Sequence, residues 1–574
     1  MKYVYAFKEG NKDMRELLGG KGANIAEMRR LNLPVPNGFT VTTEACNKYY
    51  QDNERLSNEI LDEIKEHIKE LEIETGKILG DPSNPLLLSV RSGSRASMPG
   101  MMDTILNLGI NDEVAKGFSI KTGNERFVYD SYRRFIQMFS DVAMSLPKGS
   151  FEKIFSDIKK YKGVTLDTEL TSNDLRQVVE IYKEEYRRLA NEEFPTDPLV
   201  QLERAVKAVF RSWNNERAIT YRKLNNIPNS WGTAVNVQEM VYGNSGEKSG
   251  TGVAFTRNPA NGKKELFGEF LLNAQGEDVV AGIRTPQTMD KLKELFPDCY
   301  EEFVRISDTL EHHYKDMQDM EFTIDNSKFY ILQTRNGKRT GEAAINIAVD
   351  LVNEGMITKE EAIMKVDASL LDQLLHPVFK EESLRKAQVV ARGLAASPGA
   401  ATGKIYFDSK DLKKAKEKGE KELILVRLDT SPEDIEAMLI AEGILTIHGG
   451  MTSHAAVVAR GIGVCCVSGC SEILIDEENK TLTLKDGRVL KEGDYLSLNG
   501  STGEVYAEHI EKTEKEITGN FSTFMSWVDM FRRLKVKANA DTKKDALIAN
   551  RFNAEGIGLC RTEHMFFNEE RIFN

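Results

Sequence analysis

The stretch GILTIHGGMTSHAAVVARGIGVCCVSGC, residues 443–470, decides the fold of the part of the chain that contains it. Its opening apolar run is typical of a buried strand, and the paired glycines that follow permit a tight turn. A helix is predicted to open near Thr452 or Ser453 as N-cap, with small alanines behind it. Together with the strand-like LILV at 423–426, this order predicts a small α/β unit.

The same stretch places His454 in the first turn of the predicted helix. The free N–H groups and the positive end of the helix dipole would stabilise a phosphate carried on that imidazole. Histidine suits the role of phosphate acceptor because a pKa of about 6.5 leaves it mostly neutral and nucleophilic at cellular pH. Taken alone, a histidine at this position more often only caps or packs at a helix start.

Composition limits the classes of function. The chain has 574 residues, 40% of them apolar, which is enough for several domains with separate cores. Its net charge of -12 disfavours binding to nucleic acid or to an anionic membrane, so bound phosphate requires a local cluster of cations. The six cysteines lack the spacing of a zinc site or a disulfide framework. No apolar run suits a signal peptide, and we expect a cytoplasmic protein.

Changes of pattern divide the chain into successive segments. Short strands, glycine-rich turns and amphipathic helices predict an α/β multidomain protein. The expected segments are an α/β domain at 1–340 with a helical insertion at about 110–225, a helical connector at 341–388, a second α/β domain at 389–506, a linker and helix at 507–533, and a β-α-β segment at 534–574. The last segment is typical of the start of a parallel barrel, and it is too short to close one.

Two glycine-rich turns in the first domain carry positive charge. The strand-like LLLSV ends at Arg91, and Gly93, Ser94, Arg95 and Ser97 are expected in the loop that follows. Guanidinium forks, hydroxyls and free N–H groups are the means by which proteins bind polyphosphate. LGGKGANIAEM supplies Lys21 at a helix start, and neither turn is a Walker loop. A surface turn with incidental arginines is the alternative interpretation.

The segment QDMEFTIDNSKFYILQTRNGKRTG predicts a β-hairpin with a three-residue turn at 326–328. Strand alternation then puts Asp319 and Glu321 on one face. In this register Glu321 lies opposite Gln333, and Asp319 lies opposite Arg335. Carboxylate and amide oxygens in this arrangement suit a magnesium ion that bridges phosphates, although charged residues facing solvent from an ordinary strand would give the same alternation.

Several of these segments resemble one family. GGMTSHAAVVAR resembles the phosphohistidine signature of the enzymes that use phosphoenolpyruvate, and the Thr-Ser-His form, VCCVSGC and MPGMMDTILNLG resemble the pyruvate, phosphate dikinase family. The similarity runs over essentially the whole chain. It implies an ATP-grasp nucleotide-binding domain, a swivelling phosphohistidine domain and the first part of a (β/α)8 barrel. It also implies Mg2+ and a monovalent cation, K+ or NH4+, as cofactors.

The resemblance implies roles for individual residues. The catalytic residues would be His454, Arg335 and Arg91. Nucleotide and phosphate contacts would come from Lys21, Arg91, Gly100, Met102, Gln238, Met240, Val241, Thr251, Glu277, Asp278, Asp319 and Arg335. Glu321 and Gln333 would hold the metal, and Arg561 matches a phosphate-binding arginine of the phosphoenolpyruvate and pyruvate domain. Thr452 matches a threonine that is phosphorylated for regulation in plant members.

The reaction implied for an intact member converts ATP, phosphate and pyruvate into AMP, diphosphate and phosphoenolpyruvate, through pyrophospho- and phosphohistidine intermediates on His454. Full-length members continue beyond residue 574, so we expect this chain to retain only the half-reactions of ATP and phosphate. The resemblance also implies a homodimer for a full-length member. The alternatives are a phosphoenolpyruvate synthase, in which water is the acceptor, and a non-catalytic phosphohistidine carrier.

Overall fold

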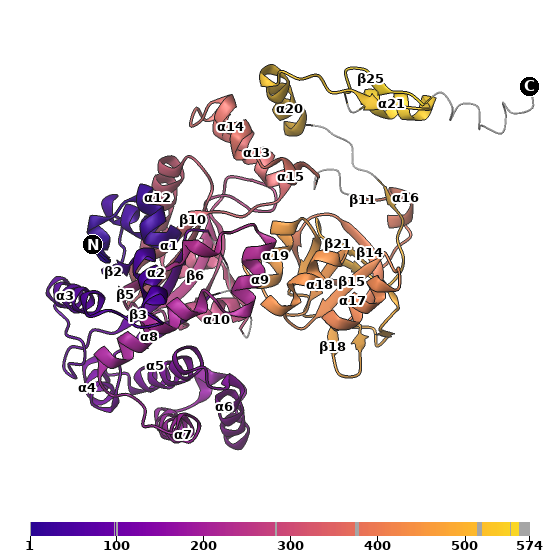
Figure 1. Ribbon diagram of the computed structural model, residues 1–574. Coiled ribbons are helices and arrows are strands. Elements are labelled where there is room, and N and C mark those ends of the chain that lie inside the picture. The colour runs from indigo at the N-terminus through magenta and orange to yellow at the C-terminus, as the bar shows by residue number, and fades with distance from the viewer. Residues whose placement is uncertain are drawn as a thin grey trace, which may run out of the picture. The chain divides into compact units, whose positions relative to one another are not determined.

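The computed structural model describes residues 2–96, 98, 102–281, 284–372, 378–513, 519–551 and 553–561. The chain forms two compact units, one of Met1–Ile347 with Ala368–Glu516 and the other of Ala348–Asp367 with Ile517–Asn574. Both strands and helices occur throughout, which confirms the predicted α/β multidomain class (Figure 1). No helix in the described part of the chain is long and apolar enough to cross a membrane.

Two five-stranded sheets form the first part of the larger unit. The first has the order β1-β2-β5-β3-β4 and consists of Val4–Ala6, Gly38–Val41, Thr233–Glu239, Leu88–Ser94 and Thr104–Leu108. The second has the order β10-β9-β6-β7-β8 and consists of Lys328–Asn336, Gln318–Asp325, Gly250–Phe255, Phe267–Leu272 and Gln287–Thr288. Residues 240–249 join β5 of the first sheet to β6 of the second. All neighbouring strands in both sheets are antiparallel.

Helices precede, interrupt and follow these strands. Those near the N-terminus are α1 (Arg15–Arg30), α2 (Thr43–Gln51) and α3 (Asn58–Thr75), and those between or after the strands of the second sheet are α10 (Gly276–Ala281), α11 (Met289–Leu295), α12 (Pro297–Tyr314) and α13 (Gly341–Asn353). Helix α1 contacts β3 and β5 of the first sheet and also β10 of the second. A residue on α1 can therefore take part in a site that both sheets share.

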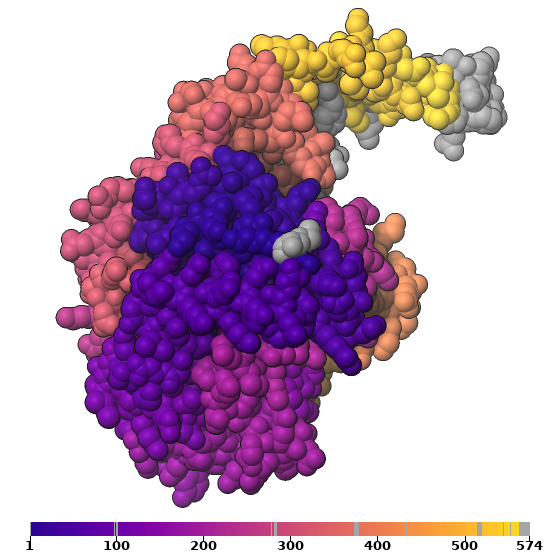
Figure 2. Space-filling model, turned by 60° about the vertical axis from the view of Figure 1, so that its left-hand side comes forward, coloured from indigo at the N-terminus to yellow at the C-terminus, as the bar shows by residue number. Residues whose placement is uncertain are grey.

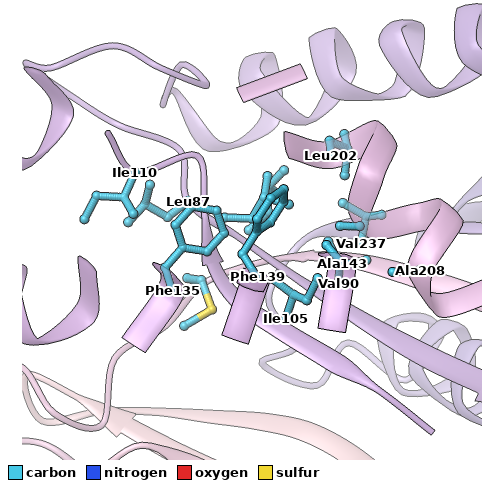
Figure 3. Close-up of a cluster of buried hydrophobic side chains, with 14 of the residues drawn as sticks. Leu87, Val90, Ile105, Ile110, Phe135, Phe139, Ala143, Leu202, Ala208 and Val237 are labelled. Carbon is cyan, nitrogen blue, oxygen red and sulfur yellow. The ribbon is translucent and has the colours of Figure 1, made fainter. Parts of the chain in front are cut away.

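A run of helices separates β4 from β5 in sequence. It consists of α4 (Asp112–Thr122), α5 (Glu125–Met138), α6 (Lys148–Lys162), α7 (Ser172–Ala190), α8 (Pro198–Ser212) and α9 (Glu216–Leu224). The indigo N-terminal elements and the purple helices form one continuous face in the space-filling view (Figure 2). Side chains of α5 and α8 pack against the first sheet around Phe135, Phe139 and Val237 (Figure 3). The helical run and the first sheet therefore share one hydrophobic core. Each fully buried Leu or Phe side chain in it contributes about 1.5–3 kcal/mol.

An eight-stranded mixed sheet forms the rest of the larger unit. Its order is β12-β22-β21-β14-β15-β16-β17-β13, with bounds Val389–Arg392, Glu504–Tyr506, Tyr495–Asn499, Ala400–Tyr406, Leu423–Arg427, Gly443–Thr446, Cys465–Ser468 and Leu394–Ser397. The central strands β14 to β17 are parallel. Helices α17 (Ser409–Glu417), α18 (Ile435–Ile440) and α19 (His454–Ile462) lie between them in sequence. The small α/β unit predicted from residues 443–470 is confirmed.

Minor elements complete the larger unit. They are α15 (Ala368–Asp372), α16 (Glu381–Leu384), the paired strands β11 (Val378–Phe379) and β23 (Lys512–Thr513), and a three-stranded sheet of β18 (Leu474–Asp476), β19 (Thr481–Thr483) and β20 (Val489–Lys491).

The smaller unit contains a helix pair and a β-α-β segment. Helices α14 (Lys359–Lys365) and α20 (Asn520–Phe531) contact each other, and Lys359 Nζ lies 5.7 Å from the ring of Trp527. Strands β24 (Ala538–Asn539) and β25 (Ile557–Leu559) are parallel and flank α21 (Lys543–Arg551). The β-α-β order predicted for this segment is present, and its assignment to a barrel stays a prediction.

Candidate active site

A cavity of about 620 Å³ has walls from both five-stranded sheets and from the helical run. This volume is in the range of sites for small-molecule ligands of nucleotide size. Of the residues named from the sequence, Arg91, Met102, Gln238, Met240, Val241, Thr251 and Glu321 line it. A neighbouring cavity of about 720 Å³ shares Asp103, Asp141, Val142 and Arg217 with it and extends to Glu433 and to Ile435 and Glu436 at the start of α18.

A break in α1 allows Lys21 to reach this cavity's charged end. Gly19 has φ 69° and ψ 170°, a conformation that only glycine adopts readily. A Cβ atom at Gly19 would lie 1.7 Å from the carbonyl oxygen of Gly93, so the close approach of α1 to β3 also requires glycine. The approach brings Lys21 near Arg91 on β3. Strand β3 continues to Ser94, so Arg91 lies inside the strand, and the expected loop after it was placed too early.

The hairpin of β9 and β10 has the predicted pairing, with a different turn. Asn326 and Ser327 both have positive φ and form a two-residue turn, as in the hairpins whose twist matches that of the strands. The three-residue turn predicted from the sequence is therefore wrong. A β-bulge at Leu332 shifts the register by one residue, and beyond it Glu321 pairs with Gln333 and Asp319 with Arg335. Leu332 and Glu321 both line the cavity.

Charged groups from β3, β9 and β10 form ion pairs at this end of the cavity. Arg91 Nη2 lies 2.5 Å from Glu321 Oε2, and Arg335 Nε lies 2.7 Å from Asp319 Oδ2. Burial opposes ionisation of Glu321, but Arg91, Lys21 and Arg335 outweigh it and lower its pKa to about 2. Burial raises the pKa of Asp319 despite the neighbouring Arg335. Glu321 is thus an anion at neutral pH in a site with an excess of cations.

Lys21 has an unusually low pKa. Burial and then repulsion by Arg91 and Arg335 lower the pKa of Lys21 to about 7, against the opposing effect of Glu321. An anion that enters the site would raise the pKa of Lys21 and restore the charged ammonium, because the carboxylates balance only part of the positive charge of the site. The site is therefore suited to polyphosphate.

His454 is the first residue of α19, as predicted. Ser453 is the N-cap, and its side chain accepts a hydrogen bond from Ala456 N. The imidazole is half-buried, with Nδ1 3.2 Å from Thr430 Oγ1, while Nε2 is buried without a hydrogen-bond partner. Burial and then Lys338 lower the pKa of His454, and Asp434 opposes them. A neutral ring with a hydrogen atom on Nδ1 has its lone pair on Nε2, which is the atom available as a nucleophile.

The turn before α19 contacts the second five-stranded sheet. Glu269 on β7 accepts hydrogen bonds from Met451 N at 3.2 Å and from Thr452 Oγ1 at 3.4 Å. Gly450 is so close that a Cβ atom there would lie 2.1 Å from Glu269 Oε2. Burial raises the pKa of Glu269, and the two hydrogen bonds oppose this effect. The loop that carries His454 is thus docked on the sheet that contributes Glu321 and Gln333.

The residues expected to hold a metal fit that role. Gln333 Oε1 and Asp319 Oδ1 are buried without hydrogen-bond partners, close to the ionised Glu321. Oxygen ligands of this kind suit magnesium, which takes few protein ligands and completes its shell with phosphate oxygens and water. Within the described residues, no cluster of three His, Cys, Asp or Glu side chains could hold a metal by itself.

Other predicted residues lie elsewhere or are not described. Asp278 does not line the cavity, because its carboxylate pairs with Arg134 at 2.8 Å and accepts a hydrogen bond from Gln275 N. Arg561 belongs to the smaller unit, where its backbone N–H donates to Asp541 Oδ1 at 2.6 Å. Gly100 and the side chain of Glu277 fall outside the described residues.

Sequence reasoning missed three residues around His454 and its loop, which are Lys338, Thr430 and Glu269. Lys338 follows Arg335 by three positions in TRNGKRTG, and this proximity was a usable signal. Thr430 and Glu269 gave no signal, since only the folded chain brings them to the loop.

Comparisons with known proteins place these features in one family. The family model described as pyruvate phosphate dikinase, AMP/ATP-binding domain, matches residues 15–79, 55–297 and 289–355. The models described as PEP-utilising enzyme, mobile domain, and PEP-utilising enzyme, PEP-binding domain, match residues 419–503 and 515–574.

Individual relatives agree over the whole chain. A pyruvate, phosphate dikinase of Clostridium symbiosum is 61% identical over 572 residues, which are 100% of this chain and 65% of the relative. A chloroplastic enzyme of that name from Mesembryanthemum crystallinum is 55% identical over 100% of this chain and 60% of its own length. Pyruvate, phosphate dikinase 2 of Zea mays is 55% identical over 98% of this chain and 64% of its own. The chain thus spans between 60% and 65% of the length of these relatives.

Proposed function

Because the chain belongs to the pyruvate, phosphate dikinase family, we propose that it carries out the ATP- and phosphate-dependent half of the dikinase reaction. A complete protein of this kind would convert ATP, phosphate and pyruvate into AMP, diphosphate and phosphoenolpyruvate. The steps assigned to this chain end with a phosphohistidine at residue 454. The observation that carries the proposal is the unpartnered Nε2 of His454, on a loop docked against the sheet that holds Glu321.

Two transfers make up this half-reaction. First, His454 Nε2 attacks the β-phosphorus of ATP, the bond from that phosphorus to the oxygen bridging the α-phosphorus breaks, and AMP leaves with the electron pair. Next, an oxygen of inorganic phosphate attacks the terminal phosphorus of the pyrophosphohistidine, and the bond to its bridging oxygen breaks. Diphosphate is formed by joining the acceptor phosphate and the terminal phosphoryl group. One phosphoryl group stays on Nε2.

Different residues of the site would have different roles in these steps. Residues 240 and 241, at the connection between the sheets, line the cavity and would contact the base. Lys21, Arg91 and Arg335 would bind phosphate oxygens and offset the charge that accumulates as they are brought together. Thr430 would hold the Nδ1 proton of His454, which keeps the lone pair on Nε2. Magnesium bound at Glu321 and Gln333 would neutralise phosphate charge and align the groups for in-line attack.

The finer assignments belong to the same proposal. The two five-stranded sheets would be an ATP-grasp domain, the eight-stranded sheet a swivelling phosphohistidine domain, and the β24-α21-β25 segment the first part of a barrel. Arg561 would bind the phosphate of phosphoenolpyruvate. A monovalent cation, a cytoplasmic location, homodimer formation by the full-length protein and regulation by phosphorylation of Thr452 are further expectations from the family.

Labelled ATP tests the central assignment. With magnesium, label from [β-32P]ATP should stay on the chain both with and without phosphate. Label from [γ-32P]ATP should stay only without phosphate and should appear in diphosphate once phosphate is added. A His454→Asn variant should retain neither label, because it lacks the nucleophile. His448→Asn is the matched control, since His448 lies on the same loop with its Nδ1 paired to Asp429 at 3.0 Å.

The outcomes separate the alternatives. Release of γ-label as free phosphate without added phosphate would indicate water as the acceptor, as in a phosphoenolpyruvate synthase. A chain that takes no label from ATP but is labelled by a phosphorylated partner would be a carrier. Equal labelling of His454→Asn and the unaltered chain would contradict the proposal. The dikinase names of the relatives favour phosphate as the acceptor.

A further inference from the structure

Lys338 is a cation near the site that none of the steps above uses. It lies two residues after the end of β10 and three after Arg335, and its Nζ lies 3.8 Å from the position that a Cβ of Gly461 on α19 would occupy. It therefore stands between the charged end of the nucleotide cavity and the helix that begins with His454. Its side chain is exposed, so a small anion from solvent can reach it.

Lys338 differs from the two arginines of the site in having no carboxylate partner. Arg91 is paired with Glu321, and Arg335 is paired with Asp319. Within the described part of the chain, Lys338 makes no hydrogen bond or ion pair, and the charges it senses are Arg335, Asp319 and His454. Although Lys338 is exposed at the surface, desolvation by the surrounding protein and repulsion by Arg335 lower its pKa, against the opposing effect of Asp319. An uncompensated ammonium at such a position favours an anion that arrives from outside.

The position of Lys338 along α19 indicates which anion it meets. Residues 454 and 461 are seven apart, so they lie on the same face of the helix, about two turns or 10 Å apart. A pyrophosphoryl group on Nε2 holds its terminal phosphorus away from the ring, and the acceptor must approach from the far side for in-line attack. Three phosphorus atoms in a row span a length of the same order. A cation that lies beside α19 two turns after His454 is therefore placed for the acceptor and not for the first phosphorus.

We propose that Lys338 binds the inorganic phosphate that accepts the terminal phosphoryl group of pyrophosphohistidine. The inference rests on the proposed function and names the residue that recognises its second substrate. Lys338 would attract and orient phosphate through a single compact charge, while Arg91 and Arg335 keep the nucleotide phosphates. Loss of the ammonium should therefore impair the second transfer and leave the first intact.

Separate assays of the two transfers test the inference. In Lys338→Met, the rate at which [γ-32P]ATP labels His454 without phosphate should stay within about twofold of the parent, while the phosphate concentration for half-maximal diphosphate formation should rise at least about tenfold. Lys338→Arg should recover part of the loss, because it restores the charge. Lys263→Met is the control, since Lys263 is an exposed lysine paired with Glu265. Normal first-step labelling also shows that the variants are folded.

Direct binding gives a second readout. Millimolar phosphate should raise the thermal unfolding midpoint of His454→Asn more than that of the Lys338→Met, His454→Asn double variant, because ligand binding stabilises the folded state. An unchanged phosphate requirement in Lys338→Met would overturn the inference, as would equal losses in both transfers. If the parent takes no label at all, the proposed function fails and the inference fails with it. If the parent is labelled and Lys338→Met has the same phosphate requirement as the parent, the inference alone fails.

Discussion

At the scale of single residues, the positive charges of the site exceed its negative charges, and Lys21 shows the consequence most directly. Its pKa is about 7, against 10.5 for an ordinary lysine, because burial and Arg91 disfavour the ammonium. Bound polyphosphate restores the charge, so ATP binding should take up a proton when the pH lies above about 7. In that range the apparent affinity for ATP should therefore fall as the pH rises, by up to about tenfold per unit.

Lys21→Arg isolates this effect, because a guanidinium stays protonated throughout the range. Its affinity for ATP should be nearly constant between about pH 7.5 and about pH 9, where the phosphates of ATP are already ionised. The measurement is equilibrium dialysis of labelled ATP with chains that also carry His454→Asn, so that no transfer occurs. A Lys21→Arg chain with the same slope as its Lys21 parent would show that another group takes up the proton.

At the scale of elements, the break in α1 is a precise structural requirement. Gly19→Ala combines a conformation that only glycine adopts readily with a Cβ placed 1.7 Å from a backbone oxygen of Gly93. The backbone of β3 is paired with β5 and cannot withdraw. We expect a loss of about 2 kcal/mol or more in the free energy of unfolding and weaker ATP binding, measured by urea unfolding and by dialysis. Gly149→Ala in α6 is the control, since a Cβ there meets nothing within 4 Å.

The hairpin of β9 and β10 shows how far the sequence could predict the site. The register of an assumed three-residue turn predicted the pairs Glu321 with Gln333 and Asp319 with Arg335, and the structure contains both pairs. The turn was wrong by one residue, and the bulge at Leu332 restores the register, so two errors cancelled. A bulge depends on contacts with neighbouring strands and with the residues that line the cavity, and neither can be predicted from local sequence. The length of β3 was underestimated for a similar reason, since its pairing with β5 continues past Arg91.

At the scale of the whole molecule, the site exists only because distant segments meet within the larger unit. Residues 269, 338, 430 and 454 come from four parts of the chain, and their meeting around the loop at 449–453 is a property of the docked arrangement. The motif itself predicted the helix, its cap and the place of His454 at its start. The surface on which the motif docks could not be predicted from the residues, because docking depends on complementary shapes built by separate sheets.

Gly450 tests this docking without altering a charged or reacting group. A Cβ there would lie 2.1 Å from Glu269 Oε2, so the carboxylate would have to move and give up its hydrogen bonds to Met451 N and Thr452 Oγ1. The loss of about 1–2 kcal/mol from such bonds predicts labelling of His454 about tenfold slower in Gly450→Ala, with unchanged ATP affinity. In a Glu269→Ala background the same substitution should have little further effect, because its obstacle is absent. Equal slowing by Gly450→Ala in both backgrounds would place the obstruction elsewhere than at Glu269.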